Sequence, residues 1–347
     1  MYKNIIHEDI KNILQNTKIN WDLFKNKTIL IAGGNSFIAK YIIEVFLHLN
    51  DKKKFNVKII SVVRNKKKFI KYFNNKKNIK IIHQDICDSI NISNKIDHIF
   101  HLASISSPKY YKTHTLDMLK PNVIGTFNLL NLAVKNKVKS FIYFSSGQVY
   151  DASNLPLNEN SKLDSSGLQI SSLYSASKRA GESLCYTFHL QKKVPIKIIR
   201  LFHTYGPGMD LNDGRVMMDF ISDLIKKKNI KIKSSGNQHR SFCYITDTIS
   251  AFFQILINGT NGNIYNVGNN KCMISIKSLA KLLAKLSDNI RVEFKKRSKN
   301  DNYLTSKLTK VFPDTKKLYK LGWKPQISVK QGFLRSISYY SNILKKN

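Results

Sequence analysis

The stretch KTILIAGGNSFIAKYIIEVF, residues 27–46, decides the fold prediction. Its first eight residues form an apolar run that ends in two glycines, which is typical of a buried strand and a tight turn. The residues that follow have helical periodicity, with Phe37, Ile38, Tyr41, Ile42, Val45 and Phe46 on one side. A strand, a glycine turn and a helix in this order predict the first unit of a dinucleotide-binding fold.

The turn itself departs from the usual glycine pattern. A turn that holds a pyrophosphate needs a close approach of the backbone and a helix N-terminus aimed at the negative charge. Glycines usually stand at the first, fourth and seventh positions, where this chain has Gly33, Ser36 and Ala39. A Ser36 hydroxyl can donate to a phosphate, but a purely structural turn explains these residues nearly as well. The motif alone therefore leaves both interpretations open.

Apolar strand patterns alternate with helical patterns through the first two thirds of the chain. We expect strands at 57–64, 79–86, 97–104, 140–146 and 195–202, and helices at 122–136 and 174–191. This alternation predicts an α/β protein with a Rossmann doubly wound parallel sheet that is buried on both faces. The pattern becomes irregular after Phe202, which favours a smaller C-terminal α/β lobe. We expect an N-terminal helical extension at 1–26, a Rossmann domain at 27–202 and the second lobe at 203–347, with some interleaving of the chain.

The composition limits the partners of the protein. The 347 residues contain 58 Lys and Arg against 22 Asp and Glu, which gives a formal net charge of +36. The cations are mostly lysines spread along the chain, which is typical of a solvated surface, so we expect no nucleic-acid partner; a polyanion partner is the alternative. The four cysteines lack metal-ligand spacing, and no apolar run is long enough for a membrane span. We therefore expect a cytoplasmic protein without a metal site or a membrane partner.

A tyrosine and a lysine four residues apart form the candidate catalytic pair. On a helix, Tyr174 and Lys178 share a face, and a neighbouring ammonium lowers the pKa of a phenol from its usual value near 10. Ser145 and Ser146 end a predicted strand upstream, where a hydroxyl can share the reacting proton. Two ordinary residues on a helix surface are the alternative interpretation.

The end of the second predicted strand distinguishes two cofactors. An acidic residue there bonds the ribose 2′-hydroxyl of NAD, whereas an arginine accommodates the 2′-phosphate of NADP. This chain has Ser61 at the position where we expect the acid, and Arg64 just beyond it. The sequence therefore favours NADP over NAD, although Arg64 is also interpretable as one more exposed cation. Asp85 and Ile86 follow the third strand, where we expect them to meet the adenine.

Ten segments in order resemble the extended short-chain dehydrogenase/reductases of the nucleotide-sugar epimerase/dehydratase family. They are AGGNSFIA, HQDI, FHLAS, PNVIGT, FSSGQVY, YSASK, RLFHTYGPG, RSFCYITD, YNVG and LGWKP. The resemblance covers nearly all of residues 27–340, and SPKYY, DGRVMMDFI and QHRSFCYITD bring it closest to the UDP-glucuronate decarboxylases. It implies an NAD(P)-dependent enzyme of the isomerase or lyase class that oxidises a sugar at C4.

The resemblance also implies roles for individual residues. Ser146, Tyr174 and Lys178 would be catalytic, and the implied substrate is a nucleotide diphosphate sugar. The implied contacts to NADP or NAD are Gly33, Ser36, Phe37, Ile38, Arg64, Asp85, Ile86, Leu102, Ala103, Ser104, Asn122, Tyr174 and Lys178. The implied contacts to the substrate are Ser106, Gln148, His203, Arg215 and Arg240.

Two departures from the family pattern bear on the reaction. Decarboxylases carry a Glu, and 4,6-dehydratases an Asp-Glu pair, where this chain has Gly147 and Gln148, and decarboxylases carry an Arg in place of Gly208. Since an amide cannot exchange a proton as a carboxyl group does, a standard 4,6-dehydratase is disfavoured. The reaction would be C4 epimerisation or a decarboxylation, in surface-polysaccharide sugar synthesis.

Two other functions and a homodimeric assembly are also compatible with the sequence. One alternative is a 4-keto-sugar reductase that consumes NADPH, and another is a non-catalytic scaffold that binds NAD(P) or RNA. Members of the family commonly dimerise through the helix after Asn122 and the helix that carries Tyr174. The apolar positions Val123, Phe127, Leu130 and Ala133 are compatible with such a homodimer and equally with packing on the sheet.

Overall fold

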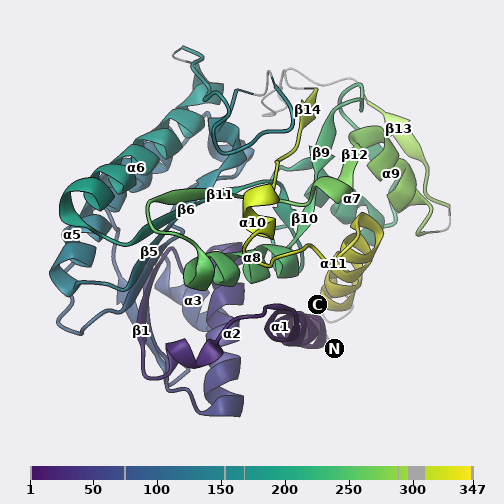
Figure 1. Ribbon diagram of the computed structural model, residues 1–347. Helices are drawn as coiled ribbons and strands as arrows, with labels where there is room; N and C mark the ends of the chain where they lie inside the picture. Colours follow the sequence, from purple (N-terminus) through teal and green to yellow (C-terminus); the bar gives the residue numbers. More distant parts are fainter. Residues whose placement is uncertain are drawn as a thin grey trace.

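The computed structural model describes residues 2–73, 76–151, 154–167, 169–287, 289–295 and 309–344. A seven-stranded sheet forms its centre, in the order β11-β6-β5-β4-β1-β2-β3, and every neighbouring pair is parallel (Figure 1). Its strands are β1 (Thr28–Ala32), β2 (Lys58–Val63), β3 (Ile79–His83), β4 (His98–His101), β5 (Ser140–Ser146), β6 (Ile196–Leu201) and β11 (Asn263–Val267). The order of β1 to β6 is that of a doubly wound Rossmann fold, as predicted. β11 joins this sheet from beyond residue 202.

Side chains of the sheet alternate between two apolar layers. In β1, Ile29 and Ile31 belong to one buried cluster, whereas Leu30 and Ala32 belong to the other. The first layer is completed by α2 (Phe37–Lys53), α3 (Lys66–Phe73) and α8 (Ile245–Asn258), and the second by α5 (Thr126–Asn136) and α6 (Ile170–Lys192). Burial on both faces explains why these strands are apolar throughout.

The second part of the chain forms small sheets and short helices. Its strand groups are β10-β7, β12-β9-β14 and β13-β8. These elements are β7 (Thr204–Tyr205), α7 (Val216–Ile225), β8 (Ile230–Ile232), β9 (His239–Ser241), β10 (Cys243–Tyr244), η5 (Asn270–Cys272), β12 (Met273–Ser275), α9 (Ile276–Ala284), β13 (Val292–Phe294), β14 (Lys310–Val311), α10 (Lys316–Tyr319) and α11 (Val329–Leu344). They form the smaller lobe that the irregular pattern after Phe202 predicts.

Short helical turns lie between the strands of the main sheet. They are η1 (Trp21–Phe24), η2 (Pro108–Tyr110), α4 (Thr115–Lys120), the π-helical η3 (Pro121–Gly125) and η4 (Gly147–Val149). η2, α4 and η3 carry the chain from β4 to α5, and η4 follows β5 directly. The loops and turns at this end of the sheet supply most of the site described below.

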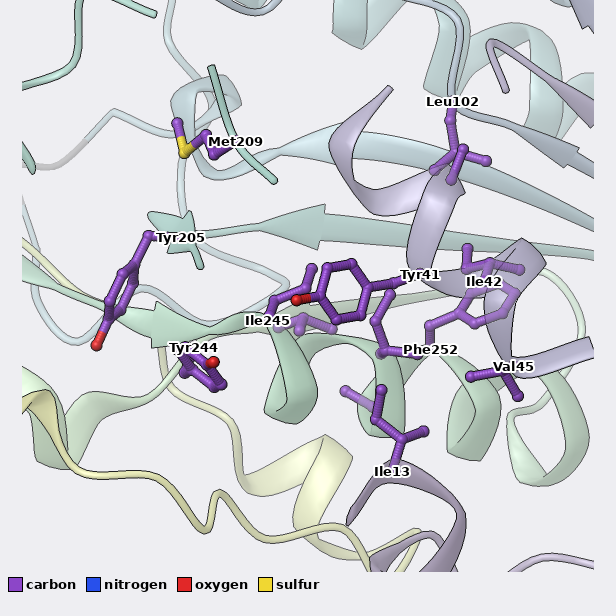
Figure 2. Packing of buried hydrophobic residues seen from close by; sticks show 14 of the residues in the cluster. Ile13, Tyr41, Ile42, Val45, Leu102, Tyr205, Met209, Tyr244, Ile245 and Phe252 are labelled. Carbon is purple, nitrogen blue, oxygen red and sulfur yellow. The ribbon is translucent and has the colours of Figure 1, made fainter. Parts of the chain in front are cut away.

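The N-terminal helix α1 (Tyr2–Asn16) joins three parts of the molecule. It packs on α2, α8 and α11, so the first and the last helix of the chain lie against each other (Figure 1). Asp9 is fully buried and accepts hydrogen bonds from Tyr41 Oη at 3.0 Å, Tyr244 Oη at 2.9 Å and Arg335 Nε at 3.0 Å. Figure 2 shows Ile13 of α1 pointing toward the apolar side chains of α2 and α8. The extension is therefore an integral part of the core.

The described residues contain neither a membrane span nor a metal cluster. None of their helices is both long and apolar enough to cross a membrane. None of their His, Cys, Asp and Glu side chains gather in the groups of three that could hold a metal ion.

Candidate functional site

A cavity of about 1430 Å³ opens at the carboxyl ends of the parallel strands. Ligands of open α/β sheets bind at this edge, where the strand order reverses. Its walls come from the turns after β1, β2, β4, β5 and β6 and from residues 208–219 and 231–240 of the second lobe. Fourteen of the residues singled out in the sequence line it: Ser36, Phe37, Ile38, Arg64, Leu102, Ser104, Ser106, Ser146, Gln148, Tyr174, Lys178, His203, Arg215 and Arg240.

The glycine turn after β1 fits a pyrophosphate. Gly33 has a φ of +85°, and a Cβ there would lie 2.6 Å from the backbone nitrogen of Ala103, so only glycine fits. Ser36 caps α2 by accepting a hydrogen bond from the backbone N–H of Ala39 at 3.3 Å. Ser104 adds a buried hydroxyl that has no hydrogen-bond partner among the described residues. The helix N-terminus and this hydroxyl together offer donors to an anion.

Ser61 does not occupy the position that selects between NAD and NADP. It pairs with Ile31 in the interior of β2 and is fully buried. Its Oγ lies 1.9 Å from the place where a Cβ on Gly34 would stand, so it packs beneath the glycine turn. The expectation of an acid position at Ser61 is therefore wrong, because the strand continues to Val63.

Arg64 is the residue that follows β2 and faces the cavity. Its Nη1 lies 3.8 Å from carboxylate oxygens of both Asp85 and Asp117, and its side chain is half exposed. Lys40 and Lys68 line the same part of the cavity. Burial, and then the charge of Lys68, lower the pKa of Lys40 to about 8. Arg64, Lys40 and Lys68 are thus three cations of the cavity lining, of which Arg64 is paired with two carboxylates.

Five of the predicted cofactor contacts lie behind the cavity wall. Gly33 and Ala103 form the close backbone contact of the turn, and the Asp85 carboxylate accepts from the backbone N–H of Cys87 at 2.9 Å. Ile86 is buried in the apolar layer beneath Gly125. Asn122 is also buried. Its Nδ2 donates to Met118 O at 2.9 Å and to Ser177 Oγ at 3.0 Å, so Asn122 connects η3 to α6.

Tyr174 and Ser146 meet at the bottom of the cavity. β5 ends at Ser146, and a side-chain hydrogen bond joins its hydroxyl to Tyr174. Ser145 is turned away, since its Oγ donates to Glu182 Oε1 at 2.5 Å. Tyr174 is only 4% exposed, and its ring stacks on that of Tyr111, with 5.3 Å between centroids. Ser146 is therefore the serine that can share a proton with Tyr174.

Two cationic side chains bear on Tyr174. Lys178 is buried, and its Nζ donates to Phe144 O at 2.7 Å and lies 6.0 Å from the centroid of the Tyr174 ring. Burial lowers the pKa of Lys178 to about 7. Burial also raises the pKa of Tyr174, while the positive charge of Arg215 and the hydrogen bond of Ser146 act in the opposite direction. Two cations therefore bear on this phenol, Lys178 from its own helix and Arg215 from the second lobe.

The predicted substrate contacts also line the cavity. Arg215 Nη2 donates to Ser106 O at 2.7 Å and to Ser106 Oγ at 3.1 Å, and its Nη1 lies 3.0 Å from Asp213 Oδ1. Burial lowers the pKa of His203 to about 3, so its imidazole is neutral, and its Nδ1 has no partner among the described residues. Arg240 lines the cavity as well. These cations and the neutral imidazole suit a ligand with negative oxygens.

The cavity residues that escaped the sequence analysis include Lys40, Lys68, Tyr111 and Asp213. The lysines do not stand out in a chain with so many cations. Tyr111 lies within the SPKYY segment and Asp213 within DGRVMMDFI, so the motifs marked the segments but not the individual residues. The stacking of Tyr111 on Tyr174 is a tertiary contact, which a linear motif does not record.

The comparisons with known proteins agree with this geometry. Residues 29–268 match the NAD dependent epimerase/dehydratase family. The chain belongs to this family, which is a class of NAD-dependent enzymes with the Rossmann fold described above.

The chain is also similar to individual proteins of known activity. UDP-glucuronic acid decarboxylase 4 of Arabidopsis thaliana is 30% identical over 309 residues, which are 88% of this chain and 66% of that protein. The chain thus spans about two thirds of that relative. UDP-glucose 4-epimerase of Thermotoga maritima shares the fold with a TM-score of 0.78 at 23% identity, over 91% of this chain and 99% of that one. UDP-glucuronic acid 4-epimerase of Bacillus cereus does so with a TM-score of 0.77 at 22% identity, over the same shares.

Proposed function

We propose that the protein oxidises C4 of a nucleotide diphosphate sugar and returns the hydride to the opposite face, as a C4 epimerase. The observation that carries the proposal is the Tyr174–Ser146 pair inside the cavity that Asn35 and Ser36, at the end of the glycine turn, also line. The cavity of about 1430 Å³ exceeds the roughly 300–1,000 Å³ that one small ligand usually occupies. It has room for a cofactor and a substrate together.

Different residues of the cavity have different roles in this reaction. The nicotinamide of a bound cofactor would take up the hydride of sugar C4. Tyr174 removes the proton of the C4 hydroxyl, and Ser146 holds that hydroxyl and shares the proton. Lys178, which also lines the cavity, binds the nicotinamide ribose. Arg215 and Arg240, from the second lobe, hold the diphosphate of the substrate. The apolar ring of Tyr111 excludes water from Tyr174.

Gln148 favours epimerisation over reactions at C5. Its side chain is exposed to the cavity and hydrogen-bonds with Tyr111. A neutral amide holds a sugar hydroxyl but does not remove the C5 proton that a 4,6-dehydration requires. Epimerisation needs no second proton shuttle, since one proton leaves the C4 hydroxyl, one hydride leaves C4, and both return.

Decarboxylation of UDP-glucuronate is the second candidate, because the curated relative named above is a UDP-glucuronic acid decarboxylase. The test is an incubation of the protein with NAD⁺ and a panel of UDP-, dTDP-, GDP- and CDP-sugars, including UDP-glucuronate. A product of unchanged mass and altered C4 configuration supports epimerisation. A product lighter by carbon dioxide establishes the second candidate. In a parallel incubation with NADPH and 4-keto-sugar nucleotides, net consumption of NADPH would instead identify a 4-keto-sugar reductase.

We further propose that the cofactor site accepts the 2′-phosphate of NADP. Arg64 stands directly after β2, and Lys40 and Lys68 face the same space. In a titration with NADP⁺ and NAD⁺, Arg64→Asp should weaken NADP⁺ binding at least tenfold and leave NAD⁺ binding nearly unchanged. Lys67→Asp, an exposed position on α3 outside the cavity, is the control for the loss of positive charge. Equal effects on both cofactors would contradict this part of the proposal.

We also propose a homodimer formed through α5 and α6. Leu130 and Ala133 pack inward on the sheet, but Phe127 is 47% exposed. Other exposed apolar side chains on α4, η3, α5 and α6 are Leu116, Leu119, Ile124, Val134, Ile170, Tyr186 and Leu190. Light scattering after gel filtration should show a dimer for the wild type and for the remote variant Leu23→Glu, and a monomer for Phe127→Glu.

The domain division and the cellular setting remain parts of the proposal. We assign cofactor binding to residues 27–202 with β11, and nucleotide-sugar binding to the rest of 203–347. The four cysteines are free, which suits the reducing cytoplasm. A place in surface-polysaccharide sugar synthesis follows if the product is an activated sugar of that kind.

A further inference from the structure

Two loops from different lobes bind each other across the mouth of the cavity. The 206–215 loop follows β7, and the 104–111 loop follows β4. Ser107 Oγ donates to Asp213 O at 2.5 Å, and Arg215 Nη2 donates to Ser106 O at 2.7 Å. Gly214 has a φ of +83° and packs against Lys109. The position of Arg215 is therefore set by a contact between the lobes.

Tyr111 links this contact to Tyr174. Its ring lies on the Tyr174 ring at an interplanar angle of 21°, and its hydroxyl donates to Ser106 O at 3.3 Å. Arg215 and Tyr111 thus donate to the same carbonyl oxygen. The docked 206–215 loop, the Ser106 carbonyl and the stacked tyrosines form one connected unit.

We propose that Arg215 is a positioning residue for the general base. Held on the Ser106 carbonyl by the docked 206–215 loop, it supplies the positive charge that makes the Tyr174 hydroxyl a competent base. The base is then active only when the two loops are bound to each other. This inference rests on the proposed function, because it takes Tyr174 as the base.

The surroundings of Tyr174 support this role. Lys178 faces it from its own helix, Ser146 and Tyr143 from β5, Tyr111 from the end of η2, and Arg215 with its partner Asp213 from the 206–215 loop. Lys178 is held by Phe144 O. Burial raises the pKa of Tyr174, and Arg215 is the charged group that counteracts burial. Removal of that charge should therefore raise the pKa of Tyr174 further and move activity to higher pH.

The test compares Arg215→Gln, which removes the charge, with Arg215→Lys, which keeps it. The titration of Tyr174 is read from the phenolate absorbance of each protein, minus that of the same protein carrying Tyr174→Phe. We expect Arg215→Gln to raise the midpoint by roughly 1–3 pH units, and Arg215→Lys to stay close to the wild type. Arg291→Gln, an exposed arginine outside the cavity, is the control for loss of one charge.

Turnover provides a second readout. The acidic limb of the kcat–pH profile should move upward in Arg215→Gln, and less strongly in Ser107→Ala, which loosens the loop without touching Tyr174. A raised KM with an unchanged titration of Tyr174 would reduce Arg215 to a substrate contact and overturn the inference. A shifted titration in a protein that converts no nucleotide sugar would support the inference and refute the proposed function. Circular dichroism verifies that each variant is folded.

Discussion

One face of α6 carries three polar residues with different roles. Tyr174, Lys178 and Glu182 follow one another at intervals of four, which places them along one side of the helix. Tyr174 bonds with Ser146, Lys178 with Phe144 O, and the Glu182 carboxylate forms an ion pair with Arg200 at 2.6 Å. Only the first two line the cavity. The same spacing thus yields two site residues and one structural ion pair.

The first prediction concerns the hydroxyl of Tyr174. Tyr174→Phe should lower kcat by about 10²–10⁴-fold, because the general base is lost. Cofactor binding should change little, because the phenyl ring can still stack on Tyr111. Steady-state kinetics and a cofactor titration measure both effects. Tyr186→Phe, at an exposed tyrosine on the same helix, should retain wild-type kcat. Full activity of Tyr174→Phe would exclude it as the base.

At the scale of the elements, helix ends were harder to predict than strands. The sequence predicted the strands within a few residues, but α6 begins at Ile170 rather than at Tyr174. Its start is fixed by reciprocal hydrogen bonds between Gln169 and Ser172, in a Ser-rich stretch with little periodicity. The sequence predicts an ordinary α-helix over residues 122–136, whereas Pro121–Gly125 form the π-helical η3. In this segment Asn122 makes buried hydrogen bonds to Met118 O and Ser177 Oγ, which a helical pattern does not reveal.

The second prediction concerns the attachment of α1. Asp9→Asn should lower the free energy of unfolding by about 1–3 kcal/mol, since Tyr41, Tyr244 and Arg335 lose their charged buried acceptor, while Arg335 keeps its ion pair with Glu8. Asp22→Asn removes a carboxylate from an exposed pair with Lys25 and should cost less than about 1 kcal/mol. Urea unfolding measures both values. Equal stabilities of the two variants would show that α1 is not held by Asp9.

At the scale of the whole molecule, buried histidines make stability depend on pH. Burial lowers the pKa of His98 to about 4 and those of His101 and His203 to about 3. In the unfolded chain a histidine titrates near 6.5, so the unfolded state binds more protons than the folded state below that pH. These histidines stabilise the fold above about pH 6.5, and that contribution is lost as the pH falls. Asp247, whose pKa burial raises to about 7, acts in the opposite direction.

The third prediction isolates one of these groups. The ring of His98 lies between Phe24 and Phe100, and its Nδ1 has no partner among the described residues. Compared with the wild type, His98→Phe should gain stability as the pH falls from 7 to 5, because it removes one site of proton uptake by the unfolded state. Thermal unfolding at both pH values measures the difference between the two proteins. A difference independent of pH would contradict the low pKa of His98.

The sequence by itself determined six strands of the sheet, β1 to β6, the glycine turn and the spacing of Tyr174 and Lys178 on one helix. These features depend on local periodicity and on residues a few positions apart, which a linear pattern records directly. It placed Ser61 wrongly and missed Tyr111, because a single strand pattern does not show where a strand ends or what packs on it.

Only the tertiary structure brought Arg215 to the Ser106 carbonyl, 109 residues away, and Asp9 to Arg335, 326 residues away. Such contacts arise when two lobes pack together, and neither segment carries a local signal of its partner. The packing of the two lobes therefore decided that Arg215 lies close enough to Tyr174 to act on it.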